Sequence, residues 1–322
     1  MSAIAPKISK AEQPGSNRDP RHRVEPHLKD LMSLYRPASL LPSWARSIRA
    51  NQSGGYLSAL KGRGMEYDES RPYQAGDDFR TLDWRVTART GKPHTKVFRE
   101  ERERPVYVCC DFSPSMFFAT QGVFKSVQAA RAAALIAWKA QQSGDRVGGF
   151  VFSAASHHEL PPERGKPGVI RLLKNLVVAG ELPETPATQG SSQALAKAVA
   201  RLKRIAKPGS LIFLLSDFRE FSETCESDLA GIAQHNDLCV LFLSDPFEIA
   251  LPTSSAHGRV TDGNADIEIV LGDNRLNQRY TDNFNSRFER ISKLATSYRM
   301  LMGQLSTTDE PMSVLQRLLG RY

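Results

Sequence analysis

Carboxylate and hydroxyl side chains end or follow two apolar runs of the sequence. Asp111, Ser113 and Ser115 stand at the end of one run, and Ser216 and Asp217 stand at the end of the other. If the two runs are neighbouring parallel strands, their carboxyl ends meet at one edge of the sheet and bring both aspartates together. Two carboxylates and several hydroxyls make an all-oxygen site, which suits a hard cation: Mg²⁺, with Mn²⁺ or Ca²⁺ as alternatives.

A third group of hydroxyls could complete this set. Ser191 and Ser192 directly precede an expected helix over 193–205, and Thr188 lies shortly before them. We expect Ser191 to be the middle ligand, with Ser192 and Thr188 as alternatives. If neutral hydroxyls are the main direct ligands, the ion keeps much of its positive charge and an open position attracts a carboxylate from another molecule. The alternative is that these hydroxyls only cap helices and a turn.

The elements that must position these residues alternate regularly along the second two thirds of the chain. The expected strands are continuously apolar and alternate with helices. This pattern predicts a parallel sheet covered on both faces. We therefore expect an α/β, doubly wound fold over residues 105–322. The expected elements are strands over 105–111, 146–153, 210–217 and 238–244, helices over 124–142, 169–178, 193–205, 229–235, 274–298 and 311–319, and a hairpin formed by 259–262 and 267–270.

Residues 55–104 form a segment that is dense in arginine and aspartate. Within it, the run Tyr73–Arg85 interleaves the aromatic side chains of Tyr73, Phe79 and Trp84 with charges of both signs. Because planar guanidinium groups pair with carboxylates and stack on aromatic rings, the run predicts a half-buried lattice of ion pairs. We expect this segment to pack on the main domain.

The first 54 residues form a basic leader. The net charge of the chain is +8, and residues 1–50 carry nine lysines and arginines against four aspartates and glutamates. We expect a disordered start followed by short helices between His27 and Ile48. Such a leader can bind nucleic acid, but it lacks the interleaved aromatics and the motif of an RNA-binding sheet, so a solvated tail is favoured.

No apolar run is long enough for a membrane-spanning helix or a signal peptide, so we expect a cytoplasmic protein without a membrane span. The four cysteines show no metal-binding or redox spacing and are expected to be reduced core residues. No pattern of a nucleophile or general base lies near the two aspartates. The sequence therefore favours a binding protein over an enzyme.

The pattern Asp111-x-Ser113-x-Ser115, followed by a later strand-end Asp217, resembles the metal-ion-dependent adhesion site of von Willebrand factor A domains. The resemblance implies that Ser113 and Ser115 bind the ion directly, with Asp111 and Asp217 close to it, in part through water. In the adhesion site the middle ligand is a threonine, whereas Ser191 stands at that place here.

The run Tyr73–Arg85 closely resembles the signature of a bacterial von Willebrand A-like family, the domain of unknown function fifty-eight family. Asp245-Pro246-x-Glu248 and the sequence Leu305–Thr307 extend the resemblance, which covers about residues 55–320. Members of this family look like companions of MoxR-type AAA+ ATPases, chaperones that assemble or activate other proteins.

The resemblance implies a non-enzymatic adaptor whose metal ion binds an acidic side chain of the ATPase or of its client protein. Two alternatives stay open. One is a metal-dependent hydrolase that uses Asp77 or Asp78 as a base, and the other is nucleic-acid binding through the leader.

Overall fold

The computed structural model describes residues 20–44, 65–74, 76–100, 104–182, 193–250, 257–261, 266–270 and 274–320. The chain forms two compact units. The main unit comprises Met1–Arg46 and Pro105–Tyr322, and the small unit comprises Ser47–Arg104.

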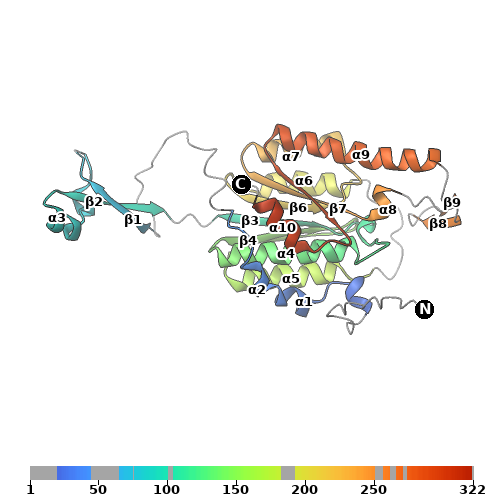
Figure 1. Ribbon diagram of the computed structural model, residues 1–322, viewed down its shortest axis with the longest axis horizontal. Helices are drawn as coiled ribbons and strands as arrows, with labels where there is room; N and C mark the ends of the chain where they lie inside the picture. The colour runs from blue at the N-terminus through green and yellow to red at the C-terminus, as the bar shows by residue number, and fades with distance from the viewer. Residues whose placement is uncertain are drawn as a thin grey trace, which may run out of the picture. The chain divides into compact units, whose positions relative to one another are not determined.

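A six-stranded sheet in the order β10-β7-β6-β3-β4-β5 forms the centre of the main unit (Figure 1). All neighbours in it are parallel except β5, which runs antiparallel to β4. The predicted α/β fold with a mostly parallel sheet is therefore confirmed. Its strands are β3 (Pro105–Asp111), β4 (Arg146–Phe152), β5 (His157–Arg164), β6 (Leu211–Ser216), β7 (Asp237–Ser244) and β10 (Leu301–Ser306).

Helices cover both faces of this sheet (Figure 1). One face is covered by α4 (Lys125–Gln142), α5 (Lys166–Ala179) and α10 (Pro311–Leu319), with the short leader helices α1 (Leu28–Ser33) and α2 (Tyr35–Ala38) packed outside α4 and α5. The other face is covered by α6 (Ala194–Ile205), α7 (Glu223–Ala233) and α9 (Asn274–Ser297). A single turn, α8 (Pro246–Ile249), follows β7.

Helix α4 is the most deeply buried helix of the described residues because its sequence is rich in alanine. Alanine has the highest helix propensity, and its short side chain lets the helix backbone lie close to the strands. The indole of Trp138 on α4 donates a hydrogen bond to the carbonyl oxygen of Leu31 at 3.0 Å. Leu31, Leu41 and Trp44 of the leader are buried, so the leader helices are part of the main unit.

Two strands of this sheet were not among the elements expected from apolar runs. β10 contains Gly303 and Gln304, which interrupt the apolar pattern, and β5 contains Pro161 and Pro162. Both strands lie at the edges of the sheet, where a missing backbone donor or a polar residue is tolerated. The expected hairpin near the end of the chain is confirmed as β8 (His257–Thr261) paired with β9 (Asp266–Val270).

The small unit is built on an antiparallel pair, β1 (Met65–Pro72) and β2 (His94–Glu100), with the helix α3 (Trp84–Thr90) between them in sequence. Asp83 caps the N-terminus of α3, and Gly91, with a φ of 70°, ends the helix in the left-handed conformation. The described part of this unit contains an ion pair between Arg71 and Asp77.

Within the small unit by itself, two of the three aromatic side chains of the run Tyr73–Arg85 are exposed. Phe79 and Trp84 are each 70% exposed, whereas Tyr73 is half-buried and lies 5.3 Å from the Phe79 ring. The carboxylates of the run are satisfied locally, because Asp78 and Asp83 accept hydrogen bonds from the backbone of the turns that follow them. The described carboxylates of the run are thus held by local caps and, at Asp77, by the ion pair with Arg71.

Candidate metal centre at the carboxyl ends of β3 and β6

Strands β3 and β6 are direct neighbours in the sheet, as the sequence predicted. Cys110 of β3 is in register with Leu215 of β6, so Asp111 and Asp217 leave the sheet at the same edge. Both carboxylates are almost completely buried, with exposed fractions of 3% and 1%. The 3-10 turn that follows β3 carries Ser113 and Ser115 into the same region.

Asp111 is held by hydroxyl and backbone donors. Its Oδ1 accepts hydrogen bonds from the Ser113 hydroxyl at 2.5 Å and from the Ser113 backbone N–H at 2.8 Å, and its Oδ2 accepts one from the Ser216 hydroxyl at 2.6 Å. Burial, and secondly the nearby negative charge of Asp217, raise the pKa of Asp111 to about 6. Burial therefore makes the ionised form of Asp111 less favourable, and a cation bound beside it would offset this cost.

Asp217 is held mainly by a buried lysine. Burial favours a higher pKa for Asp217, but the ammonium group of Lys125 and the guanidinium of Arg219 outweigh this effect and lower its pKa to about 2. The Lys125 Nζ lies 2.7 Å from Asp217 Oδ2, and the Ser115 hydroxyl also donates to this carboxylate. Asp217 therefore stays ionised at every physiological pH.

Lys125 joins Asp217 to a third carboxylate. Its Nζ donates to Glu248 Oε1 at 2.6 Å, and its side chain has no exposed surface. Arg219 Nη2 also donates to Glu248 Oε1, at 2.9 Å. Asp217 and Glu248 are thus paired with cations, whereas Asp111 accepts hydrogen bonds only from neutral donors among the described residues.

A small cavity separates the two aspartates. Its volume is about 10 Å³, which is close to the least that one water molecule or one small cation needs. The lining residues are Asp111, Ser113, Ser115, Leu195, Asp217, Arg219 and Glu220.

These donors fit a hard cation such as Mg²⁺. The side chains of Asp111, Ser113, Ser115 and Asp217 offer only oxygen, the cavity has the size of a single ion, and Asp111 lacks a cationic partner among the described residues. Arg219 also lines the cavity, and its guanidinium is paired with Glu248. No group of three or more histidine, cysteine, aspartate or glutamate side chains converges in the described part of the chain. An ion here would therefore depend on Ser113, Ser115 and water as much as on the carboxylates. Ser191, Ser192 and Thr188 lie outside the described residues.

Comparison with known proteins places the chain in a family. A family model described as "Protein of unknown function DUF58" matches residues 69–290, which is more than half of the chain. The chain belongs to the DUF58 family. Uncharacterised proteins of Mycobacterium bovis and Mycobacterium tuberculosis are each 31% identical to it over 199 residues, or 62% of this chain. This DUF58 chain spans 61% of the length of these curated relatives.

Two solved structures resemble the DUF58 chain more distantly. A conserved hypothetical protein BatB from Bacteroides thetaiotaomicron is 17% identical with a TM-score of 0.37, and an uncharacterised membrane-spanning protein from Vibrio fischeri is 14% identical with a TM-score of 0.23. Each match covers 61% of this chain and 98% of the other. Both scores are too low to carry an argument. Within the described part of the DUF58 chain, no helix combines the length and apolar character that crossing a bilayer requires.

Two further motifs of the DUF58 sequence meet beside the candidate centre. Asp245 accepts hydrogen bonds from the Thr120 hydroxyl at 2.6 Å and from the Thr307 hydroxyl at 2.8 Å, and so ties the loop after β3 to the end of β10. Asp245 also forms a capping box with Glu248, which fixes the glutamate that holds Lys125. These hydrogen bonds therefore fix the position of Glu248, which accepts a hydrogen bond from Lys125.

Sequence reasoning missed two residues of this cluster, Lys125 and Arg219. Lys125 begins a long apolar helix and gave no signal, because burial of its ammonium group depends on carboxylates about a hundred residues away. Arg219 lies two residues after Asp217 and could have been found by the strand-end argument that identified Asp217. Ser216 was noted at the strand end and Glu248 as part of a resemblance, but neither was given a role.

Asp77 and Asp78, the residues named for the hydrolase alternative, are both bonded within the small unit. Asp77 accepts hydrogen bonds from the Gln74 backbone and from Arg71, and both lower the pKa of its carboxyl group. Asp78 caps the short turn that follows it. The four cysteines are buried and free of disulfides, as expected.

Proposed function

We propose that this protein is a non-enzymatic, von Willebrand factor A-like adaptor that binds an acidic side chain of a partner protein through a divalent cation. The observation that supports the proposal most strongly is the position of Asp111, Ser113, Ser115 and Asp217 around a cavity with the size of one ion. Mg²⁺ is the cation of choice, since every donor is an oxygen and the ion readily keeps several waters.

The residues around the cavity would have different roles in binding the ion. Ser113 and Ser115 would hold the ion directly, and Asp111 would supply the nearest uncompensated negative charge. Lys125 and Arg219 already neutralise much of the charge of Asp217 and Glu248. A bound Mg²⁺ would supply an electrophilic point that a carboxylate of another protein can bind. The compensation by Lys125 and Arg219 leaves that point positive, because fewer protein charges remain to neutralise the ion.

The partner that we propose is a MoxR-type AAA+ ATPase, or a client protein that such an ATPase assembles or activates, in the cytoplasm. The resemblance of the run Tyr73–Arg85 and of Asp245–Glu248 to a family that accompanies these ATPases supports this choice. Membership of the DUF58 family is consistent with it, since that family has no assigned activity that would speak for a different role.

Metal binding is tested first by titrating the purified chain with Mn²⁺ and following the electron paramagnetic resonance of free Mn²⁺. We expect one site, and we expect Asp111→Asn and Ser113→Ala to weaken it by about tenfold or more. Asp228→Asn is the matched control, because Asp228 pairs with Lys203 at the surface of the same unit. A wild-type chain that binds no Mn²⁺ near neutral pH would contradict the proposal.

Partner binding is tested by capturing the MoxR-type ATPase of the same genome on the immobilised chain. The comparison has four arms: wild type and Asp111→Asn, each in Mg²⁺ and in EDTA. We expect recovery only with wild type in Mg²⁺. Equal recovery in all four arms would show that the ATPase binds without a metal bridge.

A further inference from the structure

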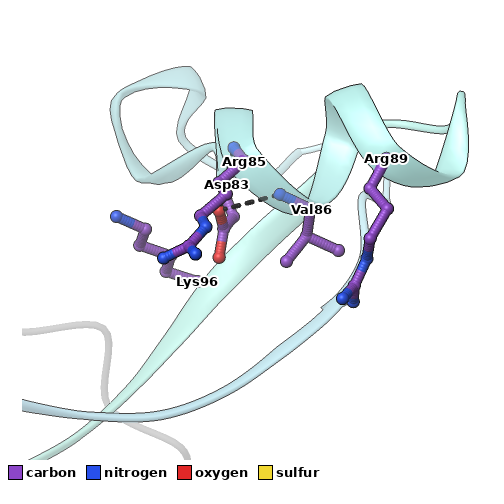
Figure 2. A pocket seen from close by; sticks show the side chains of 5 residues that line it. All are labelled: Asp83, Arg85, Val86, Arg89 and Lys96. Carbon is purple, nitrogen blue, oxygen red and sulfur yellow. Dashed lines mark hydrogen bonds between the residues drawn. The ribbon is translucent and has the colours of Figure 1, made fainter.

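The described residues that line a second concave site all belong to the small unit. It is a pocket of about 550 Å³, within the size range of binding sites for small ligands or single side chains (Figure 2). The described residues that line it are Asp83, Arg85, Val86, Arg89 and Lys96. Three of these five carry a positive charge and one carries a negative charge, so the pocket is strongly basic.

Secondary structure brings the three cations together. Arg85 and Arg89 are four residues apart on α3 and therefore project from the same side of the helix. Lys96 reaches the pocket from β2. Figure 2 shows Val86 between the two arginines, where it forms an apolar floor.

The cations of the pocket are available to a ligand. Arg85, Arg89 and Lys96 are all exposed, and none of them takes part in a salt bridge within the described residues. Asp83, the only carboxylate among the described lining residues, is occupied as the cap of α3. It accepts hydrogen bonds from the Ser70 hydroxyl at 2.6 Å and from the backbone N–H groups of Arg85 and Val86 at 3.2 Å.

Two exposed aromatic side chains accompany the pocket. Trp84, which precedes Arg85 directly, and Phe79 are both 70% exposed, although large aromatic side chains usually lie in a core. Tryptophan and arginine are enriched among the residues that contribute most of the binding energy of protein–protein interfaces. Neither ring lines the pocket itself, but Trp84 adjoins Arg85 in the sequence, so a ligand longer than the pocket can add an apolar contact to its acidic ones.

We propose that this pocket docks an acidic segment of a partner protein. Glutamate or aspartate side chains of the segment would bind the guanidinium forks of Arg85 and Arg89 and the ammonium of Lys96, and a neighbouring apolar side chain would pack on Trp84. Concentration of the cations in one pocket favours a peptide over nucleic acid, because a nucleic-acid strand needs a basic groove that follows its backbone. This binding needs no metal ion and is independent of the centre formed by Asp111 and Asp217.

The experiment measures fluorescence anisotropy of a labelled short peptide of alternating glutamate and leucine as it is titrated with the full chain in EDTA. A peptide with glutamine in place of glutamate and a labelled oligothymidine serve as comparison ligands. The test variant is the double substitution Arg85→Gln with Arg89→Gln. The matched control, Arg80→Gln with Lys92→Gln, removes the same charge from exposed positions of the same unit outside the pocket.

We expect the glutamate peptide to bind, and to bind more weakly by about tenfold or more in the test variant, with a change of less than about twofold in the control. Raising NaCl from about 50 mM to about 300 mM should weaken binding, since exposed charges are screened. Equal loss in both double variants would overturn the assignment to this pocket. Tighter binding of oligothymidine would overturn the choice of a protein ligand, and failure of the glutamate peptide to bind better than the glutamine peptide would overturn the proposal.

Discussion

The buried ion cluster of the main unit and the basic pocket of the small unit use the same side chains in opposite ways. In the buried cluster, Lys125 has no exposed surface and is bonded to two carboxylates at 2.6 and 2.7 Å. In the pocket, Arg85 and Arg89 are exposed and take part in no salt bridge within the described residues. Basic residues that look equivalent in the sequence are thus structural in one unit and available to a ligand in the other.

Solvation explains this difference. Removing an ion from water costs several kcal/mol unless a partner of opposite charge replaces the water, so a buried lysine must be paired. An exposed arginine stays hydrated and gains less than about 1 kcal/mol from a surface partner, so nothing forces it to pair. A charge at the surface can therefore stay unpaired and free for a ligand, whereas a buried charge needs a partner within the fold. Asp111, which is buried but lacks a cation partner among the described residues, is the informative exception.

The largest effect that would test this contrast is expected from Lys125→Met. Removal of the ammonium leaves Asp217 and Glu248 buried with only Arg219 to compensate them, and such a loss typically costs about 3–5 kcal/mol of the free energy of unfolding. Chemical denaturation measures it. Lys139→Met, on a half-buried face of the same helix, is the control and should cost less than about 1 kcal/mol. Equal losses in both variants would show that the buried ion pairs of Lys125 contribute no more stability than the half-buried side chain of Lys139.

A smaller effect of opposite sign is expected from Asp111→Asn. Because the pKa of Asp111 is raised from 3.8 to about 6, the folded chain without metal binds this proton more tightly than the unfolded chain does. Its free energy of unfolding should fall as the pH rises from about 4 to about 6, and the loss should be complete above that range. The asparagine variant escapes this loss and should be more stable by about 1–3 kcal/mol at about pH 8, with no gain at about pH 4.

Denaturation in EDTA at both pH values measures this effect. Asp228→Asn, which changes a partly exposed carboxylate of the same unit that pairs with Lys203, is the control and should not reproduce the gain at the higher pH. A destabilised Asp111→Asn variant at the higher pH would argue that the negative charge of Asp111 is already compensated in the metal-free chain.

The smallest effect on stability is expected from Trp84→Ala. Its side chain is mostly exposed, so the free energy of unfolding should change by no more than about 0.5 kcal/mol. Trp138→Ala is the contrast, since Trp138 is buried on α4 and donates to Leu31, and it should cost about 3–5 kcal/mol. The same Trp84→Ala chain should bind the glutamate–leucine peptide several-fold more weakly. A large loss of stability would identify Trp84 as a core residue of the small unit.

Much of the fold could be predicted from the apolar pattern. The runs that became β3, β4, β6 and β7 are nearly free of polar residues because both sides of a central strand are buried, and this pattern is visible without any coordinates. The edge strands β5 and β10 escaped prediction because an edge tolerates Pro161, Pro162 and Gln304. Exposure of Trp84 was also not predicted, because sequence composition cannot tell whether an aromatic residue faces a partner or a core.

The sequence by itself determined the type of sheet and the strand ends that carry Asp111 and Asp217, since both follow from local patterns of apolar and polar residues. That β3 and β6 are neighbours, and so bring the two aspartates together, was decided by the tertiary structure. Only the tertiary structure decided that Lys125 would lie between Asp217 and Glu248, and that Arg85, Arg89 and Lys96 would face water. The reason is physical: the state of a charge depends on the groups that surround it in space. Those groups come from parts of the chain whose separation in the sequence carries no information about their distance.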